Sequence, residues 1–374
     1  MNKFLLEARK WLTLKEPLCI VLGNDSCDLD SACCALCLAF FYNKHRQSIA
    51  DLVRVETPII PVLNTSRTNL PLKTEVTYFL RKNDILQENV ICSDEVPTSV
   101  LDASKFILVD HHVSPFNKQT IQVIDHRPFY SGSNLPTDCR LNIQEVGSCA
   151  TLVADLIFKS NVDTKSDDLL ETLKMLYAPI VLDTVNFSKD ADKAKPLDKS
   201  ISDKLESILD IDEESRVHLF NELVEARADV SSLDSLQILS KDMKIFSNFD
   251  GTRVIAIPGF PISSIAYTQM LNAKENLLKF ADTHGCDVIV LMGMKVVNGI
   301  VSRDLGVVNI KDLRLFDKII ERIADENSML SLVPNENNNF LNGKFYDQKN
   351  VKASRKQILP MVKKVLDEFY GNGP

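Results

Sequence analysis

Four short segments of this chain share one plan, in which a run of apolar residues ends abruptly in carboxylates or imidazoles. A short apolar run of this kind is typical of a buried strand in a parallel sheet. Open α/β sheets collect their ligands at the carboxyl ends of their strands. The pattern therefore predicts an α/β fold with its site at those ends. The segments read CIVLGNDSCDLDS (Cys19–Ser31), FILVDHH (Phe106–His112), VIDHRP (Val123–Pro128) and IVLDTVNF (Ile180–Phe187).

Strand-like and helix-like segments alternate through the first half of the chain. This alternation predicts a mostly parallel sheet connected by helical crossovers. The predicted strands are Leu18–Leu22, Ile59–Leu63, Val90–Cys92, Phe106–Val109 and Gln122–Ile124. The predicted helices are Ser31–Tyr42, Leu72–Arg81, Val146–Ser160 and Leu169–Leu182.

The segment 189–212 differs in composition from what precedes it, because it is rich in Lys, Asp and Ser and poor in large apolar residues, apart from a helical patch around Leu205–Leu209. A charge run of this kind is usually a solvated face, so we expect a connector here. With 374 residues the chain exceeds the ~100–200 residues of one domain. We therefore expect a first domain over 1–212 and a smaller α/β domain over 213–374.

Composition excludes several classes of protein. The formal net charge of −8 argues against nucleic-acid binding, which normally requires a basic face. No apolar run approaches the ~20 residues of a membrane span, so no membrane contact is expected. The nine cysteines are odd in number and form only one CxxC pair, which favours buried thiols in a reducing compartment. We expect a cytoplasmic protein, with a mitochondrial form left open.

The acidic residues of the four segments predict a metal site. Asp28 and Asp30 lie two residues apart after a strand, where their charges repel unless a cation lies between them. An N-cap role accounts for one of the two, but not for both. Two divalent cations, Mg²⁺ or Mn²⁺, would activate water for phosphate hydrolysis. The predicted metal ligands are Asp28, Asp30, Asp110, His126 and Asp183.

Imidazole and guanidinium groups stand beside the predicted ligands. Adjacent histidines, His111 and His112, suit phosphate-facing donors better than two satisfied core histidines. Arg127 offers a fixed fork of donors that matches phosphate oxygens. We therefore count Asp110, His111, His112 and Arg127 as the catalytic set.

Taken in order, the motifs resemble the DHH phosphoesterase superfamily, and within it the Prune group. The resemblance implies a DHH domain that carries the metals, a DHH-associated domain that binds substrate, and an active site in the cleft between them. It also implies that Arg355 and Lys356 grip phosphate from the second domain. The motifs that carry it are GNDSCDLDS, PVLNTSRTNLPL, ILVDHH, VIDHRP, VGSCATLV, VLDTVN and the C-terminal ASRKQILP.

Two positions depart from the pattern of the related pyrophosphatases. Asn24 stands where those enzymes have a metal-binding histidine. Its amide oxygen is a harder ligand than imidazole and would favour Mg²⁺ relative to Mn²⁺, and we also count Asn24 among the substrate-binding residues. Arg127 replaces a second histidine, and it cannot act as a general acid because it keeps its proton near neutral pH.

The resemblance implies three hypotheses for function. The first is an exopolyphosphatase that releases phosphate from short-chain polyphosphate. The second is a 3′,5′-cyclic-nucleotide phosphodiesterase that uses the same site. The third is an interaction protein that binds nucleoside diphosphate kinase.

Overall fold

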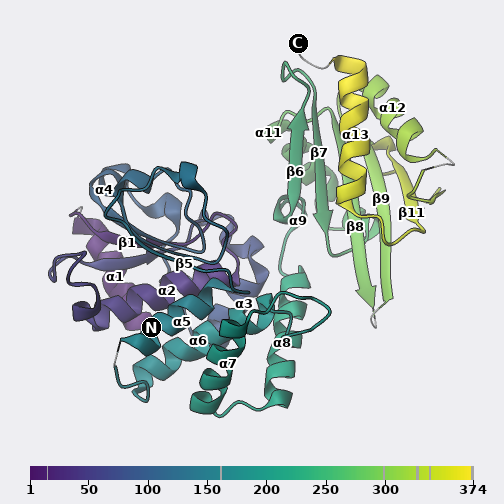
Figure 1. Cartoon of the computed structure of the whole chain (residues 1–374). Helices are drawn as coiled ribbons and strands as arrows, with labels where there is room; N and C mark the ends of the chain where they lie inside the picture. The colour runs from purple at the N-terminus through teal and green to yellow at the C-terminus, as the bar shows by residue number, and fades with distance from the viewer. Residues whose placement is uncertain (15, 161, 298–299, 326–327, 337, 372–374) are drawn as a thin grey trace. The chain divides into compact units, whose positions relative to one another are not determined.

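The computed structural model describes the chain except for residues 15, 161, 298–299, 326–327, 337 and 372–374. It divides into two compact units, Met1–Ala228 and Asp229–Pro374. Figure 1 shows that each unit has its own sheet and its own helices. The expected site in a cleft between the two domains stays a prediction.

The first unit is built on a five-stranded parallel sheet with the strand order β2-β1-β3-β4-β5. The order changes direction beside β1, which is where open α/β sheets bind their ligands. The predicted α/β class is confirmed. The strands are β1 (Cys19–Leu22), β2 (Ile59–Val62), β3 (Lys105–Val109), β4 (Thr120–Asp125) and β5 (Arg140–Ile143).

The strands of the first unit differ from the predicted ones at two places. The segment predicted as a strand at Val90–Cys92 contributes only one bridge, between Cys92 and Leu63. Strand β5 escaped prediction because its sequence, RLNI, alternates polar and apolar residues over only four positions at the edge of the sheet.

Side chains on the central strands alternate between two apolar cores. In β1, Cys19 and Val21 enter the core that contains α2, whereas Ile20 and Leu22 enter the core on the other face. Helix α2 is buried from Leu29 to Tyr42, as expected for a helix that is apolar on nearly every side. The helices are α1 (Asn2–Leu14), α2 (Leu29–Lys44), α3 (Thr74–Lys82), α4 (Thr98–Ala103), α5 (Cys149–Lys159), α6 (Asp167–Asp183), α7 (Pro196–Leu209) and α8 (Glu213–Ala228).

The prediction of a connector over 189–212 is wrong. Helix α7 lies in this segment, and its Ile201 and Leu205 belong to the main core of the first unit. The next helix, α8, also belongs to this unit, so the first unit ends at Ala228 and not at residue 212. The charged composition reflects the outer face of α7, and a few apolar positions on the inner face suffice to dock it.

The second unit contains a six-stranded sheet with the order β10-β11-β9-β8-β7-β6. All neighbouring pairs in this sheet are antiparallel except β7 with β8. Its strands are β6 (Met243–Ser247), β7 (Val254–Phe260), β8 (Val288–Val297), β9 (Ile300–Asn309), β10 (Leu332–Pro334) and β11 (Lys344–Gln348). Its helices are α9 (Ser235–Lys241), α10 (Ser264–Thr268), α11 (Ala273–Thr283), α12 (Leu313–Ile323) and α13 (Arg355–Tyr370).

Among the described residues of both units, no helix combines the length and the apolar character that crossing a membrane requires.

Candidate metal centre

The turn after β1 carries the first two acidic residues. Asp28 is the N-cap of α2, and its Oδ1 accepts a hydrogen bond of 3.1 Å from the Ser31 N–H. The N-cap role considered for one of the two aspartates is thus present. The second oxygen of Asp28 lies 3.1 Å from Ser26 Oγ.

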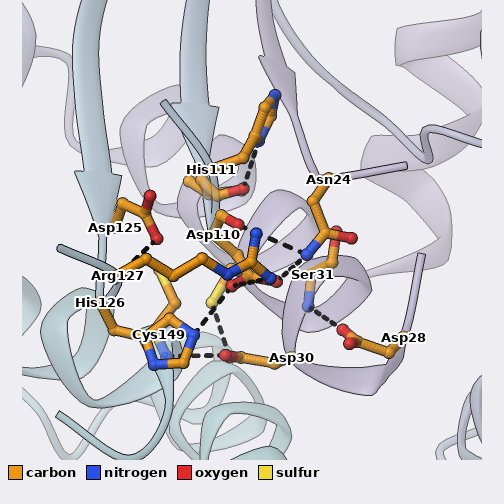
Figure 2. A network of polar contacts seen from close by, with 12 residues as sticks. Asn24, Asp28, Asp30, Ser31, Asp110, His111, Asp125, His126, Arg127 and Cys149 are labelled. Carbon is orange, nitrogen blue, oxygen red and sulfur yellow. Dashed lines mark hydrogen bonds and ion pairs between the residues drawn. The ribbon is translucent and has the colours of Figure 1, made fainter. Parts of the chain in front are cut away.

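Asn24 lies in the same turn, but its amide oxygen does not point at the other acidic residues. Asn24 Oδ1 accepts hydrogen bonds from Ser26 Oγ (2.6 Å) and from the Cys27 N–H (3.1 Å). Its amino group instead donates to the carboxylate of Asp110. In this arrangement the amide holds Asp110 through its amino group (Figure 2), and the expected contact of the Asn24 oxygen with a metal stays a prediction.

Asp30 is buried in the first turn of α2 and is held by the N-terminus of α5. Its two carboxylate oxygens accept backbone N–H bonds from Cys149 (2.7 Å) and Ala150 (2.8 Å). The start of a helix favours negative charge, because its N–H groups are unpaired and its dipole is positive there. Sequence reasoning did not assign this role to the small residues that open α5.

The N-terminus of α5 is itself fixed by Asp198 of α7. This carboxylate is fully buried and accepts hydrogen bonds from the Gly147 N–H (2.7 Å), Thr151 Oγ1 (2.5 Å) and the Lys195 N–H (2.7 Å). A Cβ at Gly147 would lie 2.8 Å from Thr184 Cγ2, so only glycine allows this close approach. The residue that fixes the start of α5 thus comes from the segment that was predicted to be solvated.

Asp110 and His126 follow β3 and β4 and meet at the centre of the site (Figure 2). The Asp110 backbone has a φ of +61°, a left-handed conformation that is unfavourable for a non-glycine residue and that often marks functional sites. Its Oδ1 lies 3.1 Å from His126 Nε2 and 3.5 Å from Arg127 Nη2. His126 Nδ1–H donates to the Val146 carbonyl at 2.9 Å, which leaves Nε2 as the atom that faces the carboxylate.

Asp183 is the last residue of α6. The prediction that this carboxylate ends a strand is wrong, whereas the predicted helix over Leu169–Leu182 is confirmed. Three consecutive non-glycine residues follow it in the left-handed region, Val185 (φ +53°), Asn186 (φ +51°) and Phe187 (φ +58°). Each such residue costs about 1–2 kcal/mol relative to the right-handed form. The chain therefore accepts strain to turn sharply after Asp183.

The acidic groups disfavour one another's charge. Burial and the charges of Asp30 and Asp28 raise the pKa of Asp110 to about 7. Burial and neighbouring carboxylates likewise raise the pKa values of Asp30 and Asp183. Burial opposes protonation of His126, but its contacts with Asp110 and Asp30 outweigh burial and raise its pKa to about 9.

These residues fit a divalent cation. Asp30, Asp110 and His126 each offer one ligand atom, and these atoms all lie within 4.8 Å of one another. Asp110 Oδ1 is buried, and no described residue gives it a hydrogen bond of good geometry. The His126 Nδ1–H bond to a carbonyl is the outer contact that metal-binding histidines usually make. Carboxylate oxygens with one imidazole suit Mn²⁺ or Mg²⁺.

The two histidines of the DHH motif have different surroundings. His111 Nδ1–H donates to the Val109 carbonyl at 3.0 Å, and its buried Nε2 has no hydrogen-bond partner among the described residues. His112 Nδ1–H donates to Asp125 at 2.5 Å, and its Nε2 accepts the Tyr130 N–H at 2.9 Å. His111 therefore has a free acceptor atom, whereas both ring nitrogens of His112 are engaged.

Asp125 is a residue that sequence reasoning missed, although it stands in the VIDHRP motif. Its side chain is fully buried between His112 and the Arg127 N–H, which donates to its Oδ1 at 3.2 Å. The predicted phosphate contact of His112 does not fit this pair. His112 and Asp125 hold the segment that carries Arg127.

A cavity of about 450 Å³ adjoins the centre. It is lined by the His111 ring, by Arg127 and by apolar side chains such as Tyr130 and Val113. The Arg127 side chain is 49% exposed, so its guanidinium is accessible from this cavity. The cavity offers room for a phosphate chain next to the acidic cluster.

The remaining predicted site residues lie in the second unit. Ser354 caps α13 and forms a capping box with Gln357, so Arg355 and Lys356 begin this helix. The Arg355 guanidinium donates to the Asp242 carbonyl (2.8 Å) and to its carboxylate (2.7 Å). The expected contact of Arg355 and Lys356 with phosphate stays a prediction.

Comparison with known proteins shows which family the chain is related to. Residues 221–365 match the model of the DHHA2 domain. The chain is 32% identical over 380 residues to the mouse (Mus musculus) protein named exopolyphosphatase PRUNE1, a match that covers 99% of this chain and 80% of the relative. It is 24% identical over 363 residues to the manganese-dependent inorganic pyrophosphatase of Methanocaldococcus jannaschii, covering 93% of this chain and 99% of that protein.

The fold also has a solved counterpart. The crystal structure of a Methanococcus jannaschii putative family II inorganic pyrophosphatase aligns with a TM-score of 0.51 and 20% identity. The alignment covers 94% of this chain and all of that one (100%). At this level of identity the similarity shows a shared fold.

The pKa shifts lead to a prediction for the metal-free protein. The folded chain binds protons at Asp110 and His126 more tightly than the unfolded chain does. In EDTA, the free energy of unfolding should therefore fall as the pH rises from 6.5 towards about 9, the window set by His126. Thermal melts at several pH values check this. Added Mn²⁺ should restore the melting temperature at high pH, and a pH dependence unchanged in Asp110→Asn and His126→Gln would contradict the assignment.

The histidine pair allows a matched comparison. His112→Ala leaves the buried Asp125 carboxylate without its partner and should lower the free energy of unfolding by about 3 kcal/mol. His111→Ala removes a ring whose Nε2 has no partner among the described residues and should cost less. Urea denaturation of both variants measures the difference. Equal losses would show that the two rings have equivalent structural roles.

Proposed function

Because this chain belongs to the Prune family of the DHH phosphoesterase superfamily, we propose that it is a metal-dependent exopolyphosphatase that releases phosphate from short polyphosphate chains. The single observation that carries the proposal is the buried Asp110 Oδ1, which lies 3.1 Å from His126 Nε2 but accepts no well-aligned hydrogen bond from a described residue, beside a cavity lined by His111 and Arg127. A polyphosphate chain binds divalent cations and presents many phosphate oxygens, so it suits a site that combines acidic ligands with an arginine.

Two divalent cations, Mn²⁺ or Mg²⁺, when bound at these residues, would supply positive charge against the phosphoryl group and a lower pKa for the attacking water. The residues of this chain hold and orient the reactants. The N-terminus of α5 fixes Asp30, and the Asn24 amide fixes Asp110. The residues proposed to hold the cations are Asp28, Asp30, Asp110, His126 and Asp183.

The cavity side chains bind the phosphate chain. The Arg127 guanidinium supplies donors to the phosphate oxygens and keeps its proton, so it acts by charge. The free Nε2 of His111 can accept a proton or a hydrogen bond from a reactant in the cavity. Burial keeps His111 neutral by lowering its pKa, which preserves this acceptor. Arg355 and Lys356 are proposed to add phosphate contacts from the second unit.

The two other hypotheses are not proposed. The relatives reported above are named for polyphosphate and pyrophosphate hydrolysis, and their names mention neither a cyclic nucleotide nor a kinase partner. A cytoplasmic location stays a prediction.

The central test is phosphate release from tripolyphosphate with Mn²⁺ or Mg²⁺, with cAMP hydrolysis measured in parallel. Asp110→Ala should abolish release, because it removes the carboxylate at the centre of the cluster. Asp51→Ala, a surface carboxylate paired with Arg140, serves as the matched control and should leave the rate unchanged. Metal-independent release, or hydrolysis of cAMP alone, would contradict the proposal.

Replacement of Arg127 tests how phosphate is held. Arg127→His supplies a group that can lose a proton near neutral pH, which arginine cannot do. We expect the turnover number to change by more than the KM for tripolyphosphate, because the introduced imidazole can donate a proton in the transition state and still offers a hydrogen-bond donor to phosphate. Steady-state kinetics separate the two constants. A change confined to KM would show that Arg127 serves in binding alone and that a proton donor adds nothing at this position.

A further inference from the structure

The turn that follows Asp183 is not stable by itself. Val185, Asn186 and Phe187 all have positive φ values, and Val185 is β-branched, which makes the left-handed form especially unfavourable. Within the turn, the Asn186 N–H donates to the Val181 carbonyl at 2.8 Å and the Val185 N–H to Leu182 at 3.2 Å. Such strained backbone persists only when the surroundings determine it.

Arg216 of α8 supplies part of those surroundings, along with the core against which Phe187 packs and with Lys199, whose Nζ lies 5.4 Å from the centre of the Phe187 ring. Its Nε–H donates to Asn186 Oδ1 at 2.9 Å, and its guanidinium lies 5.8 Å from the centre of the Phe187 ring. One side chain thus contacts two of the three strained residues. The Arg216 side chain is only 13% exposed, so these contacts are protected from water.

Arg216 is in turn held by a partly buried acidic residue. Its Nη1 donates to Glu206 Oε1 of α7 at 3.0 Å. The same Glu206 oxygen accepts hydrogen bonds from Tyr177 (2.8 Å) and Ser202 (3.1 Å). The network therefore runs from α6 through α7 to α8 and returns to the turn at the end of α6.

We propose that Arg216 is a positioning residue for Asp183, because it locks the left-handed turn that sets where this carboxylate lies relative to Asp30 and Asp110. The inference rests on the proposed metal centre and deepens it. Arg216 contacts neither metal nor substrate, and it acts only through Asn186 and Phe187. Lysine cannot replace it, because a single ammonium group lacks the planar fork that reaches Asn186 and Glu206 together.

The first measurement is the dissociation constant of Mn²⁺ for the full chain without substrate. The electron paramagnetic resonance signal of the free ion reports how much Mn²⁺ is unbound. Arg216→Ala and Arg216→Lys should each raise the dissociation constant about 10-fold or more, as loss of an outer-shell contact does. Arg140→Ala, which removes a surface ion pair with Asp51, is the matched control and should leave binding unchanged. Circular dichroism at the binding temperature confirms that each variant is folded.

The second measurement separates positioning from general stability. In the Arg216→Ala background, Val185→Gly should recover most of the lost Mn²⁺ affinity, because glycine adopts a positive φ without strain. Val185→Ala removes the same side-chain packing but keeps the Cβ, and it should not recover affinity. Equal effects of the two substitutions, or wild-type affinity in Arg216→Ala, would overturn the inference.

A third readout needs no metal. Hydrogen exchange of the peptide over residues 181–188, in EDTA, should be faster in Arg216→Ala than in the Arg140→Ala control. Unchanged exchange would show that the turn does not depend on Arg216. A wild-type protein that binds Mn²⁺ but releases no phosphate from tripolyphosphate would refute the proposed function and leave this inference standing, so the two failures are distinct.

Discussion

The mutual repulsion of buried carboxylates is the constraint on which the first unit depends. The ligand oxygens of Asp30 and Asp110 lie within 4.8 Å of each other. Two like charges at such a distance repel by about 3–4 kcal/mol at an effective dielectric constant near 20. A fold that brings these groups together must hold each one against this force. The N–H groups of α5, the Asn24 amide and His126 do so.

The topology makes this arrangement achievable with short chain segments. Strands β1, β3 and β4 are parallel neighbours, so their carboxyl ends lie at the same edge of the sheet. The change of direction beside β1 leaves space there for the turn that carries Asn24 and Asp28. Helices α5 and α6 then bring a helix start and a helix end to the same edge. The strands and helices thus bring the acidic side chains to one edge of the sheet, and the short turns that follow them set the final positions.

Sequence analysis predicted the acidic cluster because its signal is local. An apolar run that ends in Asp or His reports both the strand and the residues at its end, as at Asp110 and His126. The supporting residues carry no such signal. Asp198 lies in a charged segment that resembles a solvated surface, and only its three donors show that it is buried. The periodicity of apolar residues predicts which of them are buried. It does not predict which acidic side chain is buried and accepts hydrogen bonds there.

The orientation of the Asn24 amide and of the two histidine rings could not be predicted from the sequence either. The identity of Asn24 left open whether its oxygen or its amino group faces Asp110, and the Cys27 N–H decides this by binding the oxygen. Adjacent residues of the DHH motif likewise looked equivalent. Their separation follows from Asp125 and Tyr130, which engage both nitrogens of His112 and neither of His111.

The contact between Arg216 and Asn186 has a consequence for how the protein is made. The carboxylates of the cluster all lie before residue 184, yet the turn that places Asp183 is held from α8 (Glu213–Ala228). A ribosome-bound chain that ends before α8 carries all of these acidic side chains without the arginine that braces them. The cluster is therefore completed late in synthesis, at about the moment when the whole first unit has emerged. Under the proposed metal binding, cation capture by the nascent chain would report that this unit is fully assembled.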